Sequence, residues 1–156
     1  MTTYKKILLS HAGTSAGNKA LKHTEKLAKD LKARVTILHV VEPIPIPPSI
    51  SLSSESRQLG RELKKARHEL KIEMHKKMES LAVNLRKQDI PTSVKVTHGF
   101  PDEEIARIAK EENYDFLIMA KRKKLPGIKG ILKLGSISRK VLEKVSCPIL
   151  LIDGEK

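Results

Sequence analysis

The 156-residue sequence lacks the marks of several large protein classes. Its single cysteine, Cys147, cannot form an internal disulfide, and its Cys and His residues do not have the spacing of a zinc site. No apolar run approaches the roughly 18 residues that a membrane-spanning helix needs, and none has the pattern of a signal peptide. We therefore expect one cytoplasmic domain over residues 1–156, with neither a membrane segment nor a metal.

Aromatic residues are also scarce, at 3% of the chain, whereas the net charge is +13. A basic surface attracts nucleic acids and other polyanions. Single-strand binders, however, usually combine their basic residues with aromatic side chains on which bases stack. The composition therefore argues against nucleic acid as the main partner. A generic anion or nucleic-acid binder that uses a basic loop stays open as an alternative.

Apolar residues alternate between the spacing of strands and the spacing of helices along the whole chain. Strands are predicted at 4–10, 35–41, 92–98, 115–120 and 148–152, and helices at 16–32, at 55–87, from Pro101 and after 135–138. The apolar pattern of the last helix places Ile137, Val141, Leu142 and Val145 inside. A proline-rich loop, 42–54, separates the second strand from the long helix. This order predicts an α/β fold, a single doubly wound five-stranded parallel sheet with helices on both faces.

In such folds ligands bind beyond the carboxyl ends of the strands, here beside the loops 10–17, 41–54 and 120–138. Gly135, Ser136 and Ser138 open the last helix, where backbone amides, hydroxyls and the helix dipole favour a phosphate. The alternative is an ordinary helix cap by Ser136. The preceding loop carries cations that either offset phosphate charge or are simply solvated: Lys121, Arg122, Lys123, Lys124, Lys129 and Lys133.

Three other residues or segments at strand ends suggest chemistry that their surroundings do not support. The segment 13–19 lacks the spacing of a phosphate-binding P-loop, and a turn followed by a helix capped by Thr14 or Ser15 explains it better. His11 has no acid or nucleophile paired with it in the sequence, which favours a loop histidine over a general base. Cys147 enters a buried strand, which favours a packing role.

Four segments of the chain resemble the universal stress proteins: KKILLSHAGTS, LHVVEP, HGFPDEEIARIAKEENYDFLIMA and LGSISRKVLEKVSCPILLI. They occur in the family's order and cover most of the sequence. The resemblance implies the nucleotide-binding α-hydrolase-like fold with strand order 3-2-1-4-5. It also implies a homodimer that pairs through the last strand, which would otherwise leave an apolar edge open.

Many members of this family bind ATP or AMP, and the resemblance places such a site on this chain. Its residues would be Ser10, Ala12, Val40, Met119, Ala120, Lys123, Gly135, Ser136, Ile137 and Ser138. The backbone near Ser10 and Val40 would hold adenine, and residues 135–138 would hold the phosphates. The output would be conformational or pass through an unidentified regulatory protein, and any ATP hydrolysis would be very slow because the loops offer no general base or metal-binding acid.

The chain departs from the family's nucleotide motif at several positions. Ala12 replaces an aspartate that contacts the ribose, Ala120 and Lys123 stand where glycines are usual, and the loop up to Gly135 is longer. These departures favour an alternative, a dimeric regulatory module of the same family that binds no nucleotide.

Overall fold

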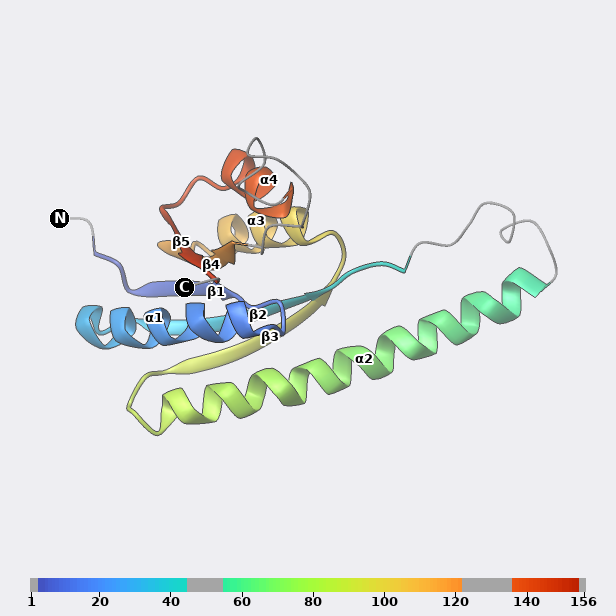
Figure 1. Ribbon diagram of the computed structural model, residues 1–156, viewed down its shortest axis with the longest axis horizontal. Helices are drawn as coiled ribbons and strands as arrows, with labels where there is room; N and C mark the ends of the chain where they lie inside the picture. The colour runs from blue at the N-terminus through green and yellow to red at the C-terminus, as the bar shows by residue number, and fades with distance from the viewer. Residues whose placement is uncertain (1–2, 45–54, 122–135, 155–156) are drawn as a thin grey trace.

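The computed structural model describes residues 3–44, 55–121 and 136–154, in which strands and helices alternate (Figure 1). The elements are β1 Lys6–Ser10, α1 Ser15–Leu31, β2 Arg34–Val41, α2 Glu55–Arg86, β3 Thr92–His98, α3 Pro101–Glu111, β4 Phe116–Lys121, α4 Ser136–Lys144 and β5 Ile149–Asp153. The strands form one parallel sheet in the order β3-β2-β1-β4-β5. The predicted fold class and strand order are confirmed.

Local sequence signals set the ends of α1. The Thr14 hydroxyl accepts a hydrogen bond from the Gly17 amide at 3.3 Å, so the predicted cap is Thr14 rather than Ser15. Gly13 precedes the cap with a φ of +79°, which glycine adopts without strain. At the other end Lys32 is left-handed, and its amide bonds back to the last turn. The chain thus turns sharply from β1 into a helix that runs back along the sheet.

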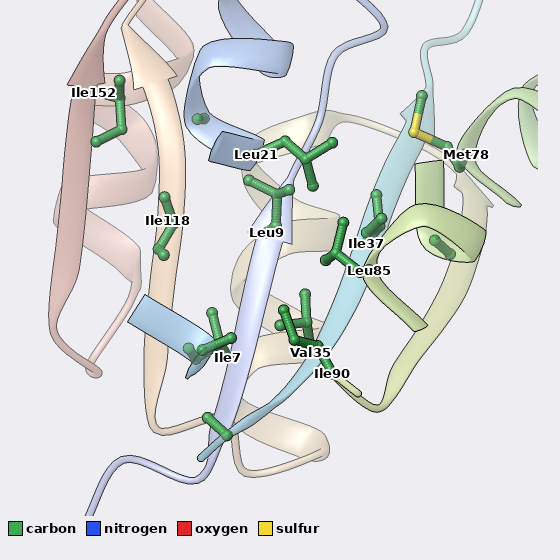
Figure 2. Close-up of a cluster of buried hydrophobic side chains, with 14 residues drawn as sticks. Ile7, Leu9, Leu21, Val35, Ile37, Met78, Leu85, Ile90, Ile118 and Ile152 are labelled. Carbon is green, nitrogen blue, oxygen red and sulfur yellow. The ribbon is translucent and has the colours of Figure 1, made fainter. Parts of the chain in front are cut away.

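Successive strand residues point to opposite faces of the sheet, and each face has its own apolar cluster. Figure 2 shows the cluster under α1 and α2, which joins Ile7, Leu9 and Ile37 of the sheet to Met78 and Leu85 of α2. On the other face the strands and helices α3 and α4 contribute Leu8, Leu38, Leu117, Met119, Ile105, Ile108 and Val141. The two clusters account for a sheet that is buried on both sides.

The long helix α2 extends well past the sheet (Figure 1). At 32 residues it is about 48 Å long, whereas β3, with 7 residues, spans only about 23 Å. The last turns of α2 bury Met78, Ala82 and Leu85 against the sheet, but Leu70 is 41% exposed. We call residues 55–71 the projecting half of α2, and the remainder the covered half.

Helix α4 packs on α3 and differs from its prediction at one position. Val141 is buried in the second cluster, but Leu142, which the apolar pattern placed inside, is 40% exposed. The apolar side of α4 is therefore narrower than its sequence suggests, because α3 contacts only one side of it. A hydrogen-bonded ion pair of 2.6 Å between Lys144 and the buried Asp102 also links the two helices, and it lowers the pKa of the Asp102 carboxyl.

Candidate functional site

The order of the strands defines where the sheet is open to a ligand. From β1 the chain passes to β2 and β3 on one side, and β4 and β5 lie on the other side. The connections that follow β1 and β4 therefore leave the carboxyl ends of these neighbouring strands in opposite directions. The two connections do not cross between the strand ends. This is the position at which open α/β sheets bind ligands.

Four of the residues predicted for the site lie on one face of the sheet at this position. Ser10 is in register with Met119 on β4, and the alternation of β1 puts its side chain on the face of Leu8. Met119 is buried in the cluster under α3 and α4, and Val40 and Ile137 pack against that cluster. The structure therefore brings Ser10, Val40, Met119 and Ile137 to the same side.

The other predicted residues are placed differently. Ala120 packs toward the α1 and α2 face, and Ala12 is exposed in the loop after β1. Ser136 is exposed at the first position of α4, whereas Ser138 is buried. Lys123, Gly135 and the other cations predicted for the loop beyond Lys121 lie outside the described residues.

The loop after β1 is held by a histidine that the sequence did not mark as structural. His11 is 1% exposed, and its Nδ1 accepts a hydrogen bond of 2.9 Å from the Gly13 amide. Since Nδ1 is the acceptor, the proton of the neutral ring is on Nε2, which donates to Asn18 Oδ1 at 2.9 Å. Burial lowers the pKa of His11, with His39 and Lys77 adding to the shift against the Asn18 hydrogen bond. The neutral ring of His11 therefore links the loop after β1 to helix α1 through two hydrogen bonds.

Two further side chains fix the backbone of the same loop. His39 Nδ1 donates to the His11 carbonyl oxygen at 2.7 Å, and Lys77 Nζ of α2 donates to the Gly13 carbonyl oxygen at 2.8 Å. Burial also lowers the pKa of His39. A Cβ atom at Gly17 would lie 2.7 Å from the His11 ring, so only glycine fits there without a shift. We call His11, Asn18, His39 and Lys77 the His11 network. Its members come from the loop after β1, from α1, from β2 and from α2.

Two signals in the sequence could have found this network. Gly17 lies in the first turn of the predicted helix, where glycine is less favourable than alanine and is used where another group approaches the backbone closely. Lys77 interrupts the apolar side of α2 between Met74 and Leu81, which suggests a polar contact for its ammonium group.

Other candidate chemistry has little support in the structure. Within the described ranges no group of His, Cys, Asp or Glu side chains could hold a metal ion. Burial raises the pKa of the Cys147 thiol, which suits the packing role predicted for it. Cys147 also borders a pocket of about 320 Å³ with Tyr114 and Asp115, at the opposite edge of the sheet from Ser10. Among the described helices, none is long and apolar enough to cross a membrane.

Comparison with known proteins agrees with this arrangement. The sequence model of the universal stress protein family matches residues 3–153. The chain belongs to the universal stress protein family. Universal stress protein MJ0577 of Methanocaldococcus jannaschii is 33% identical to it over 156 residues, covering 96% of this chain and 94% of that protein. The solved structure of MJ0577 matches with a TM-score of 0.77 and 28% identity, covering 97% of each chain.

Two solved structures of more distant universal stress proteins contain a nucleotide. One, in complex with cAMP, has a TM-score of 0.60 and 15% identity, covering 98% of this chain and 99% of that chain. The other, from Archaeoglobus fulgidus in complex with dAMP, has a TM-score of 0.58 and 14% identity, covering 97% and 99%. At this identity the likeness of this universal stress protein to them is a likeness of fold alone.

Proposed function

We propose that this universal stress protein binds an adenine nucleotide, ATP or AMP, beyond the carboxyl ends of β1 and β4. The backbone near Ser10 and Val40 holds the adenine, with Ala12, Met119 and Ala120 at the border of the site. The phosphates lie at the start of α4, against Ser136, Ile137 and Ser138, with Lys123 and Gly135 from the preceding loop. Nucleotide occupancy then changes how the protein contacts a regulatory partner in the cytoplasm.

The observation that carries this proposal is the gathering of Val40, Met119 and Ile137 in one apolar cluster at the point where the winding of the sheet reverses. An apolar surface suits a purine ring, and the start of a helix suits an anion. Relatives of the same fold in complex with cAMP and dAMP support the same class of ligand.

Calorimetric titration with ATP, AMP and inorganic triphosphate tests the proposal. We expect saturable binding of ATP or AMP, weakened about tenfold by Ser136→Ala because a hydroxyl bonded to a charged phosphate contributes on the order of 1.5 kcal/mol. Ser146→Ala, an exposed serine beyond the other end of α4, is the matched control and should bind as the unmodified protein does. Binding of triphosphate as strong as that of ATP would contradict a site for adenine.

A second candidate is a dimeric regulatory module that binds no nucleotide, and specific residues favour it. Ala12 and Ala120 give the site neither a ribose carboxylate nor the usual glycine. β5 is an edge strand whose Ile149, Leu150 and Leu151 are half-buried, as expected of a strand that pairs with a second copy. No heat with either nucleotide, together with a dimer in sedimentation that Leu150→Lys disrupts, would select this function.

A further inference from the structure

The projecting half of α2 carries three kinds of side chain on three separate sides. A step of one residue turns a helix by about 100°, so residues three, four or seven apart share a side. Leu59, Leu63 and Leu70 continue the apolar side of the covered half. Glu55, Glu62 and Glu69 recur every seven residues beside the leucines.

Basic residues follow the side of the helix away from the leucines, at steps of four and three. We call these residues the basic row, and they are Arg57, Arg61, Lys64, His68 and Lys71 of the projecting half and His75 at the start of the covered half. All six are exposed. Among the described residues, none of the four Arg and Lys side chains of the row makes an ion pair, so their charge is available to a partner. A single-sign row on a helix that leaves the body of the protein is a surface suited to a long anion.

The dimensions of the basic row match a charged rod better than a small ligand. From Arg57 to His75 the row runs about 27 Å along the helix, at 1.5 Å for each residue. Duplex DNA carries one negative charge for about every 1.7 Å of its axis, and its major groove is wide enough to admit an α-helix. Figure 1 shows the first turns of α2 standing clear of the sheet and of the other helices, where a duplex can reach them.

The position of the acids distinguishes a nucleic acid from a lipid surface. A helix that lies on an anionic membrane buries its apolar side and has cations next to that side. Here Glu55 and Glu62 lie four and three residues from Leu59, so this orientation would press carboxylates against anionic headgroups. Arg67, the cation on the other flank of the leucines, already contacts His98 at 3.2 Å. The basic row, in contrast, meets an anion with the leucines turned away from it. The charge pattern therefore favours a partner approached through the basic row alone.

We propose that the basic row of α2 binds the phosphate backbone of duplex nucleic acid without reading its sequence. The scarcity of aromatic residues argues against the stacking of single-stranded bases, but contacts to phosphate need only cations. The row is separate from the nucleotide site proposed above, since it uses none of its residues. This surface also gives a use to a helix twice as long as the sheet requires.

Fluorescence anisotropy with two duplex DNAs of unrelated sequence tests this proposal at 50 and 200 mM salt. Four phosphate contacts predict a slope of about −3.6 in the logarithm of affinity against the logarithm of salt, and so roughly a 100-fold loss between the two concentrations. Both sequences should bind equally. Replacing Lys64 and Lys71 together by glutamine should reduce the slope by about 2, with helix content unchanged in circular dichroism.

The matched control replaces Lys22 and Lys26, two exposed lysines of α1, by glutamine and removes the same charge. It should leave the slope close to that of the unmodified protein, and the α2 variant should titrate ATP as the unmodified protein does. An equal reduction of the salt slope in both variants would overturn the proposal, because binding would then depend on net charge alone. Binding to vesicles containing phosphatidylserine without binding to duplex DNA would overturn it in favour of a lipid surface.

Discussion

The two halves of α2 have the same apolar spacing and different surroundings. In the covered half Met78 and Leu85 are at most 1% exposed, because β2 and β3 lie against them. In the projecting half Leu70 is 41% exposed. The comparison teaches that apolar spacing tells which side of a helix is apolar, but the length of the neighbouring sheet decides how much of that side is buried.

Truncation of one leucine in each half should give the largest difference in the free energy of unfolding between the two halves. Leu85→Ala should lower the free energy of unfolding by about 3 kcal/mol, since it removes buried methyl groups and leaves a cavity. Leu70→Ala should change it by less than about 0.5 kcal/mol, as surface substitutions usually do. Urea unfolding measures both. Equal losses would mean that the projecting half is buried in solution, for example in an assembly.

A smaller effect is expected where the covered half meets the loop after β1. Lys77→Met removes the hydrogen bond to the Gly13 carbonyl oxygen and should lower the free energy of unfolding by about 1 kcal/mol. Lys76→Met, the same change at the neighbouring exposed lysine, is the control. If both variants unfold at the same urea concentration, the Lys77 contact does not fix the loop.

The smallest effect should appear as a dependence of stability on pH. The pKa of His11 is lowered in the folded protein, so the unfolded chain binds this proton more readily. Stability from this residue should therefore be full above pH 6.5 and fall as the pH decreases from there toward the folded pKa. His11→Asn keeps an acceptor for the Gly13 amide. It should reduce the change in the urea midpoint between pH 7.5 and pH 5. The same substitution at the exposed His75 is the control. If both variants show the same reduction in the pH dependence of the urea midpoint, the role of His11 is contradicted.

The sequence predicted the elements and their order because the patterns behind them are local. The β3 boundaries, Thr92–His98, agree with the prediction, and α2 ends at Arg86 rather than at 87. The exposure of Leu142, the burial of His11 and the projection of α2 were not predicted, because each depends on what a distant segment covers. For the candidate site, the sequence suggested Ser10, Val40, Met119 and Ile137. It did not suggest the His11 network, which positions the loop beside them.

The anchored end of β5 has a practical consequence for anyone who engineers this protein. Lys19 Nζ donates to the Gly154 carbonyl oxygen at 3.0 Å, and a Cβ at Gly154 would meet Ala16 at 2.6 Å, so the end of the last strand is pinned to α1. All five strands are parallel, so Gly154 lies at the carboxyl edge of the sheet and Lys6 starts at the other edge. An affinity tag or fluorescent fusion attached after Gly154 would crowd the proposed nucleotide, whereas one attached before Lys6 would stay a strand's length away.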